Sequence, residues 1–200
     1  MSKWGIEEKE TLEAINNIGF NGNILNIAAG DGRFNNKLLE LCDKVIATDI
    51  SEEELQILKS NCPSNLIRKL HTEIVDITKN FPFDDSVFDG VFCTGTLHLF
   101  DEKTISKILQ EIKRVLKSNG KIVLDFATDI KRLDKNKNQV IFEGEGSFST
   151  EQATSLFRNQ LSDFSLNIEE STFREENLDD DAGYNYITGN FLIISGVLNK

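Results

Sequence analysis

Short apolar runs alternate with amphipathic segments between residues 6 and 126, and this alternation limits the fold more than any other feature of the sequence. The segments whose apolar residues recur at helical spacing are 6–18, 33–42, 52–60 and 102–116. The short apolar runs between them, which predict buried strands, are 23–28, 44–48, 70–75, 89–93 and 121–126. Strands with nearly continuous apolar interiors, separated by helices, are typical of a parallel sheet covered on both faces.

The last quarter of the chain breaks this alternation. One predicted helix, 151–161, is followed by two strand-like runs, 164–173 and 186–198, with no helix between them. Two consecutive strands cannot form another right-handed crossover, so we expect an antiparallel pair at an edge of the sheet. The predicted fold is therefore α/β: a doubly wound, mostly parallel seven-stranded sheet with helices on both faces and a C-terminal antiparallel strand pair.

Capping residues mark two of the helix boundaries. Ser51 is a preferred N-cap, and Glu54 three residues later completes a capping-box pattern. Asn119 and Gly120 are expected to close the long helix that precedes them, in the manner of a glycine C-cap. The stretch 128–147 has no regular pattern and is too short to form a domain.

The composition excludes several classes of protein. A hydrophobic fraction of 39% is enough for a sizeable core, which argues against disorder. The net charge of −11 argues against binding to nucleic acid or anionic lipid, and no apolar run approaches the roughly 20 residues that span a bilayer. The polar residues 1–10 and three widely spaced cysteines predict a cytoplasmic protein with reduced thiols. No cluster of His, Cys and carboxylate residues predicts a metal site.

Much of the negative charge is concentrated between residues 169 and 181. This segment contains a single arginine, Arg174, and seven carboxylates: Glu169, Glu170, Glu175, Glu176, Asp179, Asp180 and Asp181. An acidic hairpin can simply be solvated and protect an edge strand from pairing. It can also attract a cationic substrate or a basic partner. The sequence leaves both interpretations open and favours the first.

Polar and glycine residues follow the predicted strands at the edge where an open α/β sheet binds ligands. Gly30 and Gly32 follow the first strand and allow a ligand to approach the backbone closely. Asp49 ends the second strand, 19 residues after Gly30, where a carboxylate can accept hydrogen bonds from both ribose hydroxyls. Asp76 and Ile77 end the third strand and combine a hydrogen-bond acceptor with an apolar contact, as an adenine ring requires.

Two kinds of nucleoside ligand compete for this edge. A dinucleotide site requires G-x-G-x-x-G, but Asn35 stands where the third glycine belongs. Asp31 also places a negative charge where a pyrophosphate needs amide donors. A nucleoside ligand without phosphate is therefore favoured, and a dinucleotide-dependent oxidoreductase is disfavoured.

These residues resemble the motifs of class I S-adenosylmethionine-dependent methyltransferases, in particular small-molecule, type 11-like methyltransferase domains. Residues 24–32 (Ile-Leu-Asn-Ile-Ala-Ala-Gly-Asp-Gly) are similar to the first motif of that family. Asp49, Asp76, residues 88–91 leading to Leu97-His98, and residues 112–121 are similar to the later motifs, in the expected order and spacing. The resemblance covers about residues 23–126 and implies a Rossmann-like fold whose sheet ends in a reversed seventh strand.

The resemblance also implies a role for each matching position toward the cofactor S-adenosylmethionine. Gly30 and Gly32 would line the loop under the methionine and ribose portion, and Asp49 would bind the ribose hydroxyls. Around the adenine, Asp76 would accept from the amino group, with Ile77 and Ile50 on either face of the ring. At the end of the fourth strand, Cys93 and Thr94 would offer backbone groups to the methionine ammonium.

The chain departs from the family pattern at two of the expected cofactor-binding positions. Asn26 stands where the family commonly has an acidic residue, and Ala28 where it commonly has glycine. Asn26 lacks the charge that attracts an ammonium, and Ala28 adds a methyl group where the backbone comes close to the ligand. These differences motivate an alternative function: a non-catalytic S-adenosylmethionine-binding module that regulates or pairs with another protein.

The length and the lack of a visible domain boundary predict one domain, 1–200. We expect it to consist of an N-terminal helix (1–22), a cofactor-binding core (23–128) and a substrate-side insert with the C-terminal hairpin (129–200). Methyl transfer requires alignment and exclusion of water rather than a catalytic triad. His98, just after the fourth strand, is the candidate base or substrate-orienting residue, while Asp125 is expected to make a strand-end hydrogen bond. The Asn-Pro-Pro-aromatic run of relatives that methylate adenine or glutamine and the Pro-Cys run of cytosine-methylating relatives are both missing. The expected acceptor is therefore a small molecule, and a protein acceptor stays open as an alternative.

Overall fold

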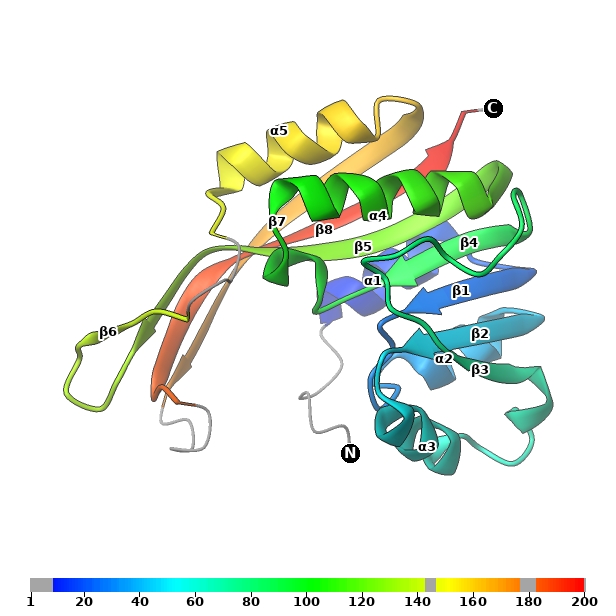
Figure 1. Cartoon of the computed structure of the whole chain (residues 1–200), viewed down its shortest axis with the longest axis horizontal. Helices are drawn as coiled ribbons and strands as arrows, with labels where there is room; N and C mark the ends of the chain where they lie inside the picture. The colour runs from blue at the N-terminus through cyan, green and yellow to red at the C-terminus, as the bar shows by residue number, and fades with distance from the viewer. Residues whose placement is uncertain (1–8, 143–146, 177–182, 200) are drawn as a thin grey trace.

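The computed structural model describes residues 9–142, 147–176 and 183–199. In these ranges five helices surround one eight-stranded sheet (Figure 1). The strands are β1 (Asn23–Ile27), β2 (Lys44–Asp49), β3 (Leu70–Ile74), β4 (Phe88–Cys93), β5 (Leu116–Leu133), β6 (Gln139–Val140), β7 (Phe164–Glu176) and β8 (Tyr186–Leu198). The helices are α1 (Lys9–Ile18), α2 (Asn35–Leu41), α3 (Glu52–Asn61), α4 (Glu102–Val115) and α5 (Thr150–Gln160).

The strand order is β3-β2-β1-β4-β5-β8-β7, and the two-residue β6 pairs with β5 outside this path. β1 to β5 run parallel, whereas β8 lies antiparallel between β5 and β7. The predicted mostly parallel sheet with a C-terminal antiparallel pair is therefore confirmed. The order reverses beside β1, which pairs with both β2 and β4, and this is the point where doubly wound sheets bind ligands.

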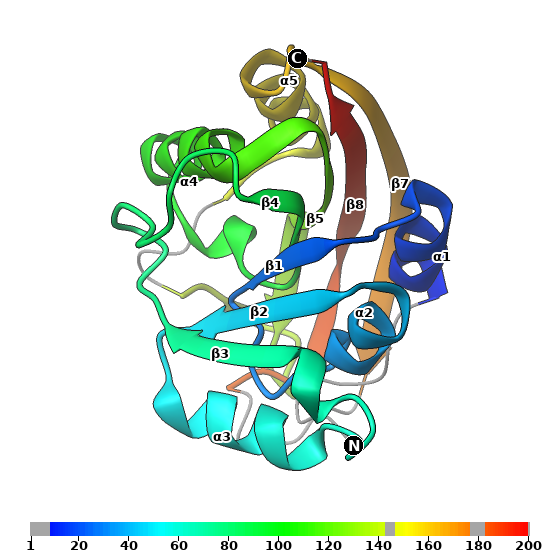
Figure 2. The ribbon, with the colours of Figure 1, turned by 90° about the vertical axis from the view of Figure 1, so that its right-hand side faces the viewer.

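Each face of the sheet has its own apolar core because neighbouring strand residues point to opposite faces. In β1, Ile24 packs with α1 and α2, while Leu25 belongs to the larger core under α4 and α5. Figure 2 shows α1 and α4 on opposite sides of the central strands. In the part of the chain that the structure describes, no helix has the length and apolarity needed to cross a membrane.

The end of α4 differs from the expected glycine C-cap. The helix ends at Val115, and β5 has already begun when the chain reaches Asn119, whose φ is 60°. The reason is a long-range contact: Ser86 N–H donates to the Arg114 carbonyl, and Val87 N–H donates to the Val115 carbonyl. These bonds draw the chain into the sheet five residues earlier than the predicted strand start at 121, so Asn119 and Gly120 form an irregularity within β5.

The stretch 128–147 is also more regular than its sequence indicates, because β5 continues to Leu133. Beyond the parallel strands, residues 127–133 of β5, 171–176 of β7 and 186–191 of β8 form a three-stranded extension that we call the arm (Figure 1). The acidic residues of β7 in the described ranges are exposed, as expected for a charged edge strand, and Asp179, Asp180 and Asp181 lie outside those ranges.

The first hydrogen bond of the capping box predicted at Ser51 is present. The Ser51 hydroxyl accepts the Glu54 N–H at 3.3 Å, as expected at the start of α3. Because Asp49 lies two residues before this cap, the cap helps to fix the backbone where the candidate site begins.

Arg114 at the end of α4 holds the loop between β3 and β4 in place. Its guanidinium donates to the Phe81 carbonyl at 3.1 Å, to the Phe83 carbonyl at 2.7 Å and to Asp85 at 2.8 Å. It also makes two hydrogen bonds to Glu111, whose carboxylate accepts the Phe81 N–H. Since these hydrogen bonds join the loop to α4, Arg114 should contribute more to stability than an ordinary surface cation.

We expect Arg114→Ala to lower the free energy of unfolding by about 2 kcal/mol, because charge-assisted hydrogen bonds to two half-buried carbonyls are lost together. Urea denaturation followed by circular dichroism measures this change. The control is Arg158→Ala on the exposed side of α5, which should change stability by less than about 0.5 kcal/mol. Equal effects of the two substitutions would contradict the anchoring role.

Candidate functional site

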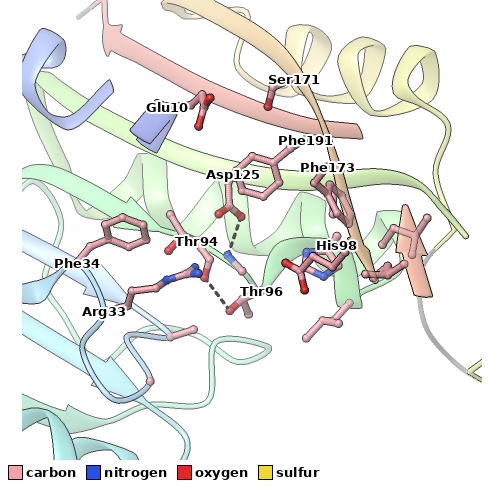
Figure 3. A pocket seen from close by; sticks show the side chains of 18 of the residues that line it. Glu10, Arg33, Phe34, Thr94, Thr96, His98, Asp125, Ser171, Phe173 and Phe191 are labelled. Atoms are coloured by element: carbon pink, nitrogen blue, oxygen red, sulfur yellow. Dashed lines mark hydrogen bonds between the residues drawn. The ribbon is translucent and has the colours of Figure 1, made fainter. Parts of the chain in front are cut away.

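A cavity of about 560 Å³ lies at the carboxyl ends of β1, β2, β4 and β5 and continues along the arm (Figure 3). It lies on the face of the sheet that carries α1 and α2, since its lining includes residues that share that core, among them Phe34, Phe92 and Phe191. This is the edge at which the sequence predicts a ligand.

The Asp49 carboxylate lines the cavity and joins the loop after β1 to the start of α3. One oxygen accepts the Gly30 N–H at 2.9 Å, and the other accepts the Ser51 N–H at 2.9 Å. A carboxylate can accept about four hydrogen bonds, so Asp49 can still receive two from a ligand. Both Asp49 and Gly30 line the cavity, as a carboxylate that binds a ribose would have to.

The loop after β1 is built from left-handed backbone conformations. The φ angles are 51° at Ala28, 53° at Gly30 and 89° at Gly32. A Cβ atom at Gly32 would lie 2.7 Å from Leu58 in α3, so this glycine is required by packing and does not itself line the cavity. Ala28 lines the cavity and has a conformation that glycine adopts more readily, which explains why a glycine is expected at that position.

The floor of the cavity is formed by the ends of β1 and β4. Asn26 lines it and is 3% exposed, with a long contact of 3.5 Å from its side-chain amide to Asn35. Thr94 also lines it, while the Cys93 side chain is completely buried beneath. Burial, with a smaller contribution from the Asp125 charge, raises the pKa of the Cys93 thiol, so this thiol is not a nucleophile. A backbone role for Cys93 and Thr94 stays a prediction.

Asp125 in β5 makes the expected strand-end hydrogen bond, and it also lines the cavity. Its carboxylate accepts the Gly95 N–H at 2.7 Å, and the side chain is 1% exposed (Figure 3). This bond fixes the loop that contains Thr94 and Thr96. The loop is the segment from which methyl-donor contacts are expected.

Arg33 lines the cavity, although its sequence pattern predicts only the start of a helix. Its guanidinium carbon lies 4.8 Å from the centre of the Phe34 ring, and Figure 3 shows the side chain directed toward Thr94 and Thr96. A cation directly after the glycine loop could have been recognised as a ligand-facing charge. It offsets part of the negative charge of Asp49 and Asp125.

The residues predicted to hold adenine lie outside the cavity lining. Ile50 is 70% exposed beside Asp49, whereas Ile77 is 7% exposed and belongs to the core under α4. The Asp76 carboxylate binds the hydroxyl and N–H of Thr78 and the ammonium of Lys79. These contacts, chiefly the Thr78 hydroxyl, lower the pKa of Asp76 to about 2. Contact of Asp76, Ile77 and Ile50 with adenine stays a prediction.

His98 lies in a short helical turn after β4 and lines the cavity. Its ring stands edge-on to Phe126, with 6.3 Å between the ring centres. The residue is therefore placed where it can face a ligand, and its catalytic role stays a prediction. Among the described residues, no group of three or more His, Cys, Asp or Glu side chains could hold a metal ion.

Comparison with known families agrees with this geometry. Residues 25–124, half of the chain, match the family model described as a methyltransferase domain. The chain belongs to this methyltransferase-domain family. The match includes every predicted cofactor-binding residue, from Asn26 to Thr94.

Curated relatives of this methyltransferase domain match over a similar stretch. The demethylmenaquinone methyltransferase of Clavibacter sepedonicus is 34% identical over 107 residues, covering 52% of this chain and 41% of the relative. The glycine/sarcosine N-methyltransferase of Aphanothece halophytica is 31% identical over 106 residues, covering 51% and 39%. An uncharacterized methyltransferase of Mycobacterium tuberculosis is 26% identical over 110 residues, covering 55% and 42%. The matches therefore span about two fifths of the length of these relatives.

Solved structures show that the similarity in fold extends beyond the matched residues 25–124, over nearly the whole chain. The YcgJ protein of Bacillus subtilis superposes with a TM-score of 0.73 at 14% identity, covering 96% of this chain and 100% of that one. The structure of DhpI in complex with SAH gives a TM-score of 0.60 at 15% identity, covering 91% and 81%. The predicted Rossmann-like architecture is thereby confirmed.

We expect Ala28→Gly to raise the free energy of unfolding by about 0.5–1 kcal/mol, because relief of the left-handed strain exceeds the entropy that glycine adds to the unfolded chain. The neighbouring substitution Ala29→Gly is the control. Ala29 is not among the positive-φ residues, so it gains no relief and should lose about 0.5–1 kcal/mol. Urea denaturation measures both changes, and destabilisation by Ala28→Gly would show that the loop is not strained at this position.

Proposed function

We propose that the protein is an S-adenosylmethionine-dependent methyltransferase that transfers a methyl group to a small-molecule acceptor. The observation that carries this proposal is the Asp49 carboxylate, which faces the cavity while it holds the Gly30 N–H. It has the acceptor capacity that a ribose requires, within a stretch that belongs to the methyltransferase-domain family.

The residues of the cavity fit the charges of the cofactor. Asp49 would receive the two ribose hydroxyls, and the exposed Ile50 would cover one face of the adenine. Arg33 would favour the carboxylate of the methionine portion. Asn26 supplies no charge for its ammonium, but the carboxylates of Asp125 and Glu10 also line the cavity and offer negative charge. The polar lining thus offsets the loss of the acidic residue that the family commonly has at position 26.

When bound, S-adenosylmethionine would supply a methyl carbon that is already activated by its sulfonium. The protein's task is then to align the acceptor atom with that carbon and to exclude water. The loop fixed by the bond between Asp125 and Gly95 would provide alignment, and His98 would orient the acceptor or take its proton. These roles need no metal and no covalent intermediate on the protein.

The nature of the acceptor is a separate proposal. The names of two relatives specify glycine or sarcosine in one case and demethylmenaquinone in the other, so family membership does not determine the acceptor. A single domain over residues 1–200 and a cytoplasmic location are also proposals. The location is supported by the free state of all three cysteines, Cys42, Cys62 and Cys93.

Titration calorimetry with S-adenosylhomocysteine tests the cofactor site. We expect binding, and we expect Asp49→Ala to weaken it at least about tenfold because two hydrogen bonds to a charged acceptor are lost. Ile50→Ser should weaken it by a smaller factor without affecting the fold, since Ile50 is 70% exposed. Asp43→Ala, which removes the same charge just before the other end of β2, is the control and should bind normally.

If S-adenosylhomocysteine fails to bind at millimolar concentration, the proposed function is wrong. If it binds, transfer of a radiolabelled methyl group to pools of small metabolites separates an enzyme from the alternative, a non-catalytic cofactor-binding module. If His98→Ala incorporates less of the radiolabelled methyl group while its affinity for the cofactor is unchanged, the proposed role of His98 is supported.

A further inference from the structure

Three strands of the arm place opposite charges on either side of one apolar residue. Ile187 in β8 pairs in register with Arg132 in β5 and with Glu175 in β7. Directly paired residues point to the same face of a sheet, and all three line the cavity. With strands about 4.8 Å apart, the Cα atoms of Arg132 and Glu175 are separated by about 10 Å. We call these three residues the charged row.

An extra residue in β5 explains why Arg132 faces the cavity. Before Thr128 the cavity-facing residues of β5 are Asp125 and Ala127, but beyond it they are Ile130 and Arg132. The register shifts between Thr128 and Lys131, as in a β-bulge, and Asp129 within it has a φ of 52°. The bulge reverses the alternation of side chains, so one wall of the cavity includes residues on both sides of it.

The bulge is held from outside the sheet. The Asp129 carboxylate accepts the N–H and the hydroxyl of Thr150 at the start of α5, each at 2.9 Å. The contacts between the arm and α5 therefore help to determine the face of the sheet toward which the Arg132 side chain points.

Two aromatic rings orient the Arg132 guanidinium. Its carbon lies 5.0 Å from the centre of the Phe142 ring and 5.4 Å from that of Tyr184. Stacking against ring faces leaves the donors of a guanidinium directed outward in its plane, which is the geometry that binds carboxylates. Among the contacts within the described ranges, the Glu175 carboxylate has no hydrogen bond or ion pair, so it can receive a cationic group.

The surface between the charges is apolar. Phe173 in β7 lies across Gly189, where an added Cβ would come within 2.8 Å of the ring. Phe173, Ile187 and Ile130 all line this part of the cavity. A ligand here therefore meets a cation, an anion and an apolar surface together.

We propose that the distal part of the cavity is the acceptor site, and that the acceptor is a small zwitterion with an apolar side chain, of the α-amino acid class. Its carboxylate binds Arg132, its ammonium lies toward Glu175, and its side chain packs against Ile187 and Phe173. Two charge-assisted hydrogen bonds of about 2.8 Å, added to the length of an amino acid backbone, approach the span of the charged row. A zwitterion meets both the cation and the anion of the charged row, whereas a singly charged acceptor is attracted by only one of them. This inference rests on the proposed function.

Binding of matched probes to the protein saturated with S-adenosylhomocysteine tests the inference. Saturation-transfer NMR and calorimetry would compare L-phenylalanine with N-acetyl-L-phenylalanine, which keeps only the carboxylate, and with L-phenylalanine amide, which keeps only the amine. L-Leucine and L-methionine vary the side chain. We expect an amino acid of this set to bind at least about tenfold more tightly than either singly charged analogue.

Substitutions should separate the contributions that the two charges make to binding. Arg132→Gln should weaken L-phenylalanine about tenfold and leave the amide unchanged, while Glu175→Gln should weaken L-phenylalanine and leave the N-acetyl compound unchanged. The matched controls are Arg174→Gln and Glu176→Gln, since these side chains bind each other and neither lines the cavity. Unchanged affinity for S-adenosylhomocysteine shows that each variant is folded.

Equal affinity for L-phenylalanine and its singly charged analogues would overturn the inference, as would unchanged binding by both charged-row variants. Failure of all three amino acids to bind the saturated protein would overturn it while leaving the proposed function intact. Failure of S-adenosylhomocysteine itself to bind would instead overturn the proposed function.

Discussion

The Asp49 carboxylate is the interaction on which the rest of the site depends. It accepts N–H groups from the loop after β1 and from the start of α3, and it thereby fixes two loops that come from different strands. Loss of this acceptor would leave both N–H groups without their partner and would release the loop that carries Arg33. Because the two bonds use only part of its acceptor capacity, the same carboxylate can build the loop and bind a ligand.

The order of the elements could be predicted from the sequence because it depends on local apolar periodicity. The end of α4 could not be predicted, because the carbonyls of Arg114 and Val115 accept hydrogen bonds from residues nearly thirty positions earlier in the chain. The arm could not be predicted either. Its bulge at Asp129 exists only when β5 pairs with β8 and when α5 supplies Thr150 as a partner.

In the candidate site, too, the residues placed by local sequence could be predicted and those placed by long-range pairing could not. Gly30 and Asp49 could be predicted because strand ends in a parallel sheet meet at one edge, so sequence spacing predicts their position. Arg132 and Glu175 share the cavity only after three strands pair in register, and neither belongs to a local motif. Asp76 also has a suitable sequence position, but its contacts with Thr78 and Lys79 could not be predicted from that position, and its role toward adenine stays a prediction.

The central claim is that one cavity, beginning at Asp49 and ending on the arm, holds both the methyl donor and its acceptor. A crystal structure of the protein with S-adenosylhomocysteine tests it most directly. We predict that both ribose hydroxyls lie within hydrogen-bond distance of Asp49, that the adenine rests against Ile50, and that the sulfur faces the part of the cavity lined by His98. Ligand bound elsewhere, or a ribose that makes no contact with Asp49, would contradict the account.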